Sequence, residues 1–243
     1  MHDVTTSRDV PVPASALAIA AHPDDVEFGC GGTLAKWAAA GCIVHHAICT
    51  DGSKGTWDPD EDIDALRDTR QAEQRAAARA LGATGEQVFL GWVDGELESG
   101  LAERGEVAKV IRTLRPEVVL GHDPWKRYRL HPDHRNAGFL AVDGVVGARD
   151  PFFFPEHGLP PHRPDTILLW EADEVDHVED ITASFDVKVA ALLEHRSQFV
   201  TTHDITDPDD PKQLARFRRW LSDVHAEVGR GVGVRWGEAF KRI

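Results

Sequence analysis

Residues 16–25 read Ala-Leu-Ala-Ile-Ala-Ala-His-Pro-Asp-Asp, an apolar run that ends in polar and turn-forming residues. A short, continuous apolar run of this kind is typical of a buried strand in a parallel sheet. In open α/β sheets, the loops that follow the carboxyl ends of the strands build the functional site. His22 and Asp25 are three residues apart across a proline-led turn, so an imidazole and a carboxylate can be directed at one ion. Asp24 is then left for another task.

A second cluster of histidine and aspartate lies far along the chain, at His131-Pro132-Asp133-His134. It can supply a third ligand, and three protein ligands with one water make up a catalytic zinc site. The alternative is that Pro-Asp-Asp is only turn chemistry and that the second cluster only begins a helix. Either motif alone fits that alternative, but two such clusters beside predicted strand ends favour a metal site.

The composition narrows the class of protein. The formal net charge of −14 argues against binding to nucleic acid or to an anionic membrane surface, because both need a basic face. No apolar run reaches the about 18–20 residues that span a bilayer. Cys30, Cys42 and Cys49 form no CxxC pair and are odd in number, which fits buried thiols in a reducing compartment better than disulfides. We therefore expect a cytoplasmic protein.

Strand-like and helix-like segments alternate along the chain. The expected strands cover residues 16–21, 43–50, 88–91, 118–121, 166–170 and 180–182. The expected helices cover residues 33–40, 65–81, 101–114, 136–148, 185–195 and 213–228. This alternation predicts an α/β fold, a Rossmann-like three-layer sandwich with a mostly parallel sheet. Residues 14–243 are expected to form a single domain, and the polar residues 1–13 a flexible N-terminal arm.

Two further motifs suggest a ligand-binding site, but their spacing does not match the site that each suggests. The glycines of residues 29–32 lack the third glycine of a dinucleotide-binding GxGxxG pattern. The alternating acids of residues 58–64 lack the glycine and the glutamate that an EF-hand calcium loop requires, so they are better explained as charges at the start of the next helix. Residues 150–164, rich in proline and phenylalanine, are expected to pack under a lid or against a partner subunit.

The first motif, followed by Gly29-Cys30-Gly31-Gly32-Thr33-Leu34, resembles the signature of the PIG-L/LmbE-like zinc-dependent N-deacetylases, which include the deacetylases of the mycothiol and bacillithiol pathways. The resemblance runs from about residue 17 to about residue 240. It implies that the metal ligands are His22, Asp25 and His134. Spacing alone does not say which of the two adjacent aspartates binds the metal, and the resemblance decides this.

The resemblance also implies catalytic roles. Asp24 would take the proton of the attacking water, because a carboxylate beside that water is suited to this task. His131 would act as an imidazolium that stabilises the developing charge, held in orientation by Asp133 or by another carboxylate. Zinc is the expected ion, and iron(II) suits the same ligands.

Substrate contacts are expected at three positions. Arg70 matches an arginine of the family that reaches the substrate, although Arg70 and Glu73 are also spaced for a surface ion pair. Asp51 lies in a segment that resembles the Thr-Asp-Gly-Glu of the family, with Ser53 in place of the acidic residue. Arg129 stands where mycothiol-pathway relatives have a tyrosine, and it is expected either to bind an anionic group of the substrate or to pair with a nearby acid.

Three functions remain open at this point. The first is a zinc hydrolase that removes acetyl from an N-acetyl amino sugar or a related small acetamide. The second is an amidase that cleaves a larger amide, such as a thiol conjugate, with the same metal chemistry. The third is a non-catalytic Rossmann-like binding module, which would not need both Asp24 and His131. The expected partner is a small acetamido substrate, and the sequence allows a homo-oligomer without deciding the oligomeric state.

Overall fold

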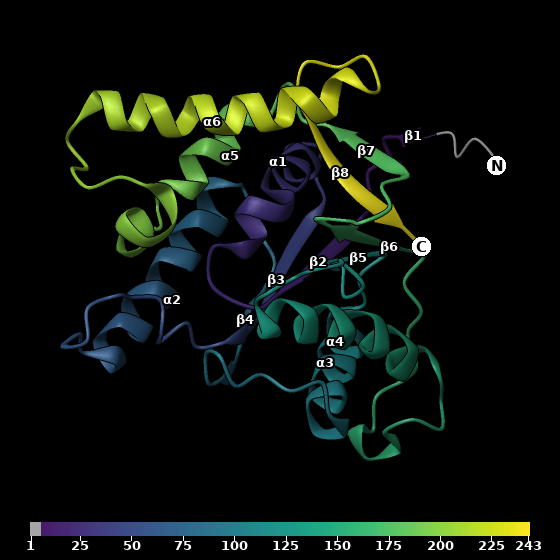
Figure 1. The fold of residues 1–243 in the computed structure, drawn as a ribbon. Coiled ribbons are helices and arrows are strands. Elements are labelled where there is room, and N and C mark those ends of the chain that lie inside the picture. Colours follow the sequence, from purple (N-terminus) through teal and green to yellow (C-terminus); the bar gives the residue numbers. More distant parts are fainter. Residues whose placement is uncertain (1–5) are drawn as a thin grey trace.

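The computed structural model describes residues 6–243 (Figure 1). The strands are β1 (Ser7–Arg8), β2 (Ser15–Ala20), β3 (Ile43–Thr50), β4 (Gln87–Trp92), β5 (Val118–His122), β6 (Thr166–Trp170), β7 (His177–Asp180) and β8 (Gly237–Arg242). The α-helices are α1 (Asp25–Ala39), α2 (Ile63–Ala80), α3 (Leu101–Leu114), α4 (Pro132–Arg149), α5 (Phe185–Leu192) and α6 (Pro211–Arg230). Short turns of helix are η1 (Pro155–His157), η2 (Arg196–Gln198) and η3 (Phe199–His203).

The strands form one sheet in the order β1-β7-β8-β6-β5-β2-β3-β4. All neighbours are parallel except β8, which runs antiparallel to both β6 and β7. From β2 the chain adds β3 and β4 on one side and β5 and β6 on the other, so β2 and β5 meet where the strand order reverses. Ligands bind at the carboxyl ends of the strands beside such a reversal. The predicted α/β fold with a mostly parallel sheet is confirmed.

Helices cover both faces of the sheet, as Figure 1 shows, with α3 and α4 below it and α1, α5 and α6 above it. The side chains of β2 alternate between two cores, because successive residues of a strand point to opposite faces. Leu17 and Ile19 pack with residues of α3 and α4. Ala16, Ala18 and Ala20 pack with residues of α1. A third cluster joins α5 to α6 through residues such as Phe185 and Leu221.

The first helix differs from the prediction of residues 33–40, because α1 already begins at Asp25 and runs through the glycines. A β-carbon at Gly29 would lie 2.6 Å from the Trp170 ring, and one at Gly32 would lie 2.9 Å from Ile181. The glycines therefore allow close packing of α1 inside the fold. The helix also has a kink at Cys30, whose φ is −147°.

Two terminal segments join the sheet against expectation. The prediction of a flexible arm over residues 1–13 is wrong for its second half, since Ser7 and Arg8 form β1 beside β7 and Val10 is buried. Residues 1–5 lie outside the described residues. The strand β8 was not expected, because its sequence is too polar for an apolar-run signal. The predicted strand at 180–182 is instead β7, three residues earlier.

Residues 150–164 were expected under a lid or against a partner subunit, and the structure assigns most of this loop to another role. Arg112 donates hydrogen bonds to the backbone carbonyls of Gly147, Ala148, Asp150, Phe153 and Phe154. Phe154 packs onto α3 and α4, close to Gly105 and Gly147. The loop is therefore fixed to the α3–α4 layer. None of the helices within residues 6–243 combines the length and apolar content that crossing a membrane requires.

Candidate active site

The loop after β2 holds the first motif in a turn that the motif itself stabilises. The backbone N–H of His22 donates to Oδ2 of Asp25 at 2.7 Å. Asp24 lies between them with φ 97° and ψ −28°, a backbone conformation that residues with a side chain rarely adopt. Strain of this kind persists only where neighbouring groups fix the backbone, and such positions cluster at active sites.

Helix α2 supplies two of those groups, from residues one turn apart. The guanidinium of Arg70 donates to the carbonyls of Pro23 at 2.7 Å and Gly52 at 2.8 Å. Gln74 accepts a hydrogen bond from the backbone N–H of Asp24 at 2.9 Å. Glu73 faces elsewhere, where it accepts from the backbone and hydroxyl of Ser197 at 2.8 and 2.6 Å. The alternative of an Arg70–Glu73 surface pair is therefore wrong, and the buried Arg70 joins two loops at the edge of the site.

A buried polar network supports Gln74 in turn. Its amide donates to Oε1 of Glu27 at 2.9 Å, and Nε2 of His195 lies 3.2 Å from Oε2 of the same glutamate. All three side chains are buried. His195 precedes the short helical turn η2, which contains Ser197, the partner of Glu73. In this network His195 contacts Glu27, and Glu27 accepts a hydrogen bond from Gln74. Gln74 in turn fixes the backbone of Asp24.

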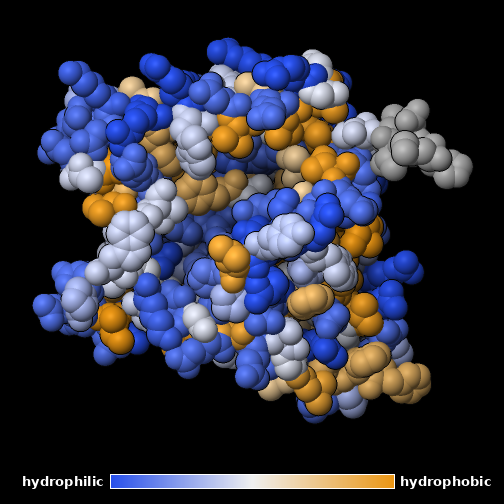
Figure 2. All heavy atoms as spheres, in the orientation of Figure 1, coloured by the Kyte–Doolittle hydropathy of each residue, from blue (hydrophilic) through white to orange (hydrophobic). Residues whose placement is uncertain are grey.

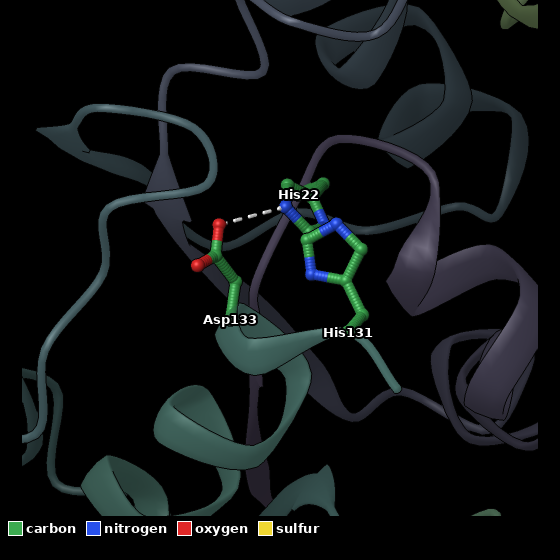
Figure 3. Close-up of side chains that lie close together, drawn as sticks. All are labelled: His22, His131 and Asp133. Carbon is green, nitrogen blue, oxygen red and sulfur yellow. Dashed lines mark hydrogen bonds and ion pairs between the residues drawn. The ribbon is translucent and has the colours of Figure 1, made fainter. Parts of the chain in front are cut away.

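The second motif begins α4, with His131 at the N-cap position and Pro132 in the first turn. Asp133 does not orient His131 as expected. Its Oδ2 lies 3.1 Å from Nε2 of His22 and accepts the backbone N–H of Gly95 at 2.6 Å (Figure 3). The ring of His131 lies 4.6 Å from the ring of His22, edge to face. The motif thus contributes a carboxylate behind His22 and an imidazole beside it.

The three predicted metal ligands come together. Nδ1 of His22 lies 3.3 Å from Oδ2 of Asp25, and Nε2 of His134 lies 3.3 Å from Oδ1 of Asp25. The three ligand atoms lie within 4.8 Å of one another. The other nitrogen of His22 faces the carboxylates of Asp133 and Asp94, at 3.1 and 3.2 Å. A metal-binding histidine commonly donates its second N–H to a carboxylate in this way, so the donor set fits a divalent metal ion.

Two other groups of side chains have a similar spacing, but their atoms are engaged. One is His22 with His131 and Asp133, and the other is His122 with His134 and Glu171. Asp133 already accepts from His22, Gly95 and Leu97. Glu171 pairs with Arg129, and Nδ1 of His122 accepts from the Trp170 indole at 3.0 Å. Of the three sets, the ligand atoms of His22, Asp25 and His134 are therefore the least engaged by other groups of the protein.

Burial and charge separate the two adjacent aspartates. Burial raises the pKa of Asp24 to about 6, although the Arg70 guanidinium opposes that rise. Burial would raise the pKa of Asp25 as well, but the charges of His134 and His122, together with hydrogen bonds from His122 and His22, hold the pKa of Asp25 well below its usual range. Asp25 is thus ionised near neutral pH, whereas Asp24 can gain and lose a proton. Burial, followed by the nearby His22 charge, lowers the pKa of His131.

Three further residues reach the site from strand ends that the sequence did not distinguish. Asp94 follows β4, His122 ends β5 and Glu171 follows β6. Nε2 of His122 lies 3.4 Å from Oδ2 of Asp25, and its ring stacks on that of His134 with centroids 4.4 Å apart. The rule that identified His22, a polar residue directly after a buried strand, also finds these three residues once the parallel order is known.

Arg129 and Asp51 differ from their expected roles. The Arg129 guanidinium pairs with Glu171, and its NH1 lies 3.0 Å from Nδ1 of His134. This is the alternative of a local acid partner rather than a free anion-binding arginine. Oδ1 of Asp51 accepts the backbone N–H groups of Ser53 and Asp94 at 3.0 and 3.1 Å. Asp51 therefore orders the loop after β3 and lies outside the lining of the described cavity.

The site opens into a cavity of about 960 Å³. Its lining includes the predicted residues His22, Asp24, Asp25, Arg70, Arg129, His131 and His134. Figure 2 shows the face of the molecule that is hollowed below α6. A concave, partly apolar cavity with convergent charged groups is the usual form of a small-molecule site.

A parallel α/β sheet whose strand ends carry a buried histidine–carboxylate set beside a carboxylate with a raised pKa is the arrangement of a metal-dependent hydrolase. The sequence profile of the PIG-L family, described as GlcNAc-PI de-N-acetylase, matches residues 17–145, more than half of the chain. The chain belongs to this family, and it is an N-deacetylase.

Individual relatives agree. Diacetylchitobiose deacetylase of Thermococcus kodakarensis is 34% identical over 230 residues, which cover 93% of this chain and 82% of that protein. A 1D-myo-inositol 2-acetamido-2-deoxy-alpha-D-glucopyranoside deacetylase of Streptomyces avermitilis is 35% identical over 170 residues, which cover 59% of this chain and 57% of that protein. The solved structure of N,N'-diacetylchitobiose deacetylase from Pyrococcus horikoshii superposes with a TM-score of 0.85 at 31% identity, covering 95% of this chain and 84% of that one.

Proposed function

We propose that the chain removes the acetyl group from a 2-acetamido sugar derivative, with zinc held by His22, Asp25 and His134. The observation that carries the proposal is the placement of Asp24 and His131 beside this ligand set in one cavity. The similar proteins named above act on acetamido derivatives of glucosamine, which supports the same substrate class here. Residues 14–243 would act as one catalytic domain.

Zinc at these ligands would supply a Lewis acid that lowers the pKa of water towards about 7 and polarises the acetamide carbonyl. Asp133 and Asp94, which face Nε2 of His22, fix the tautomer that leaves Nδ1 free for the ion. Iron(II) suits the same imidazole and carboxylate ligands.

The proton transfers are then carried out by side chains of the protein. Asp24 takes a proton from the water that attacks the acetamide carbon, because its pKa of about 6 suits a base that works near neutral pH. His131, whose ring lies 4.6 Å from that of His22, stabilises the charge that develops on the carbonyl oxygen. When the carbon–nitrogen bond breaks, the amine leaves only if it gains a proton, and Asp24 or His131 donates it. The products are acetate and the free amino sugar.

Free thiols support a reducing compartment such as the cytoplasm, since Cys30, Cys42 and Cys49 are all buried and unpaired. Burial raises the pKa of Cys49 well above its usual range and that of Cys42 to about 11, which keeps both thiols protonated and unreactive.

Acetate release from a panel of substrates tests the function. The panel contains N-acetylglucosamine, its methyl glycosides, diacetylchitobiose and amide conjugates of larger acids, each offered to protein reconstituted with zinc or with iron(II). We expect acetate from the acetamido sugars and no cleavage of the larger amides. Cleavage of the larger amides alone would favour the amidase alternative. Binding without turnover by any reconstituted form would favour the non-catalytic module.

A further inference from the structure

The cavity extends well beyond the residues that the deacetylation uses. Its volume of about 960 Å³ lies at the upper end of the roughly 300–1,000 Å³ that small-molecule pockets occupy. The reacting end is polar and lies at the carboxyl ends of β2 and β5. The far part lies under α6 and is lined by Ala172, Val175, Trp220, Val224 and Val228.

The wall formed by α6 is an apolar stripe. Trp220, Val224 and Val228 are spaced four residues apart, so they lie above one another on a single face of the helix. Trp220 is 51% exposed and Val224 is 43% exposed. Val175, which follows β6 and lines the same cavity, is also 43% exposed. These apolar surfaces therefore remain accessible to whatever enters the cavity.

Polar side chains in this far part are already paired within the protein. Glu238 accepts from the backbone of Gly32, from Thr33 and from the buried ammonium of Lys188. Nδ1 of His225 lies 2.9 Å from the Gly237 carbonyl. A second sugar ring here would leave hydroxyl groups facing valine side chains, which costs free energy because they give up hydrogen bonds to water.

The cationic side chains that line the cavity also lie beside carboxylates. Arg129 pairs with Glu171, Arg70 lies 3.5 Å from Asp24, Lys54 lies 2.8 Å from Glu96, and Lys126 and Arg127 lie 3.9 and 2.5 Å from Asp173. The chain as a whole carries a formal charge of −14, which repels anions. An anionic substituent on the sugar would thus meet cations that carboxylates already engage, within an unfavourable overall field.

We infer that the substrate carries an uncharged alkyl or aryl group on its acetamido sugar, and that this group lies against the stripe of Trp220, Val224 and Val228. The inference rests on the proposed function, because it is the sugar at the metal ligands that places its substituent under α6. The stripe is continuous with the reacting end in one cavity, so the occupant is part of the substrate molecule and not a separate partner.

Chain-length dependence tests the inference. Methyl, butyl and octyl glycosides of N-acetylglucosamine, in both anomeric forms, are compared by kcat/KM with diacetylchitobiose and with a glycoside that ends in a carboxylate. Each buried methylene should raise kcat/KM by about fourfold over the first few carbons. The carboxylate-ended chain should lose most of that gain.

A pair of variants locates the effect. Val224→Asp should abolish the preference for octyl over methyl glycoside. Val187→Asp is the matched control, because Val187 is a 37% exposed helical valine on α5 that does not line the cavity, and it should keep the preference of the parent protein. Equal kcat/KM for methyl and octyl glycosides, a preference for diacetylchitobiose over octyl glycoside, or an unchanged preference in Val224→Asp would overturn the inference. Absence of acetate release from all glycosides would instead reject the proposed function.

Discussion

The side chain of Gln74, on α2, accepts a hydrogen bond from the backbone N–H of Asp24 at 2.9 Å, and Asp24 is the residue whose φ is 97°. This contact connects the proposed base to a helix that is remote in sequence. Behind it, Glu27 and His195 complete a buried chain of polar contacts. Gln74 therefore positions the proposed base, although Gln74 itself does not line the cavity.

Replacement of Gln74 by alanine should lower kcat/KM by about 10²-fold, because a misplacement of roughly 1 Å at a reacting group has an effect of that size. The metal content should stay at the parent level, since Asp24 is not among the proposed ligands. Steady-state kinetics with metal analysis checks both statements. Gln71→Ala is the matched control, one turn earlier on the same helix and half-buried. Equal activity of the two variants would show that the contact does not position Asp24.

Asp133→Ala should weaken zinc binding by about 10–100-fold, the usual effect of removing a carboxylate behind a metal-binding histidine. The physical reason is the 3.1 Å contact of Asp133 with Nε2 of His22, which selects the tautomer that exposes Nδ1 to the ion. Competition with a chromogenic chelator measures the affinity. An unchanged affinity would mean that Asp94, also close to Nε2 of His22 at 3.2 Å, is sufficient to hold the ring.

Arg129→Ala should change kcat/KM for neutral and for anionic acetamido sugars by the same factor. Its guanidinium is engaged by Glu171 and lies 3.0 Å from Nδ1 of His134, so it acts on the site and not on the charge of the substrate. Kinetics with one neutral and one phosphorylated acetamido sugar decides the matter. A selective loss for the phosphorylated sugar would restore Arg129 as an anion-binding residue.

The free energy of unfolding should fall as the pH drops from about 6.5 towards 4. Burial lowers the pKa of His203 and of His225 to about 4, whereas an unfolded chain titrates near 6.5, so the unfolded state binds more protons between these values. Each histidine contributes a slope of about 1.4 kcal/mol per pH unit in this window. Urea unfolding of the parent and of His203→Phe at several pH values checks this. In the variant, the slope of the free energy of unfolding against pH should be smaller by the contribution of one histidine. Identical slopes in the two proteins would contradict the prediction.

The sequence was sufficient to predict the residues that lie next to one another within a motif. His22, Asp24 and Asp25 follow a strand whose apolar run is unambiguous, and His131 and His134 begin a helix with a proline in its first turn. That the two motifs meet in space followed from the predicted parallel sheet, because the carboxyl ends of its strands lie at the same edge. The element bounds were close for α3 and β6, where apolar periodicity and a flanking proline are clear.

Partners that depend on tertiary contact could not be predicted. Whether Asp133 turns to His131 or to His22 is decided by the backbone amide of Gly95, which lies 38 residues away. The pairing of Arg129 with Glu171 joins the loops after two different strands. The start of α1 at Asp25 was missed because glycine is unfavourable within a helix, and here it is retained for close packing against Trp170.

Metal content and turnover, measured side by side for Asp24→Asn and Asp25→Asn, test the central claim most directly. The first variant should retain one zinc ion per chain and lose about two to four orders of magnitude in turnover, the usual contribution of a general base. The second variant should lose the metal and the activity together, because it removes the carboxylate that lies 3.3 Å from both His22 and His134. Loss of metal from Asp24→Asn with full retention by Asp25→Asn would contradict the assignment and reverse the roles of the two aspartates.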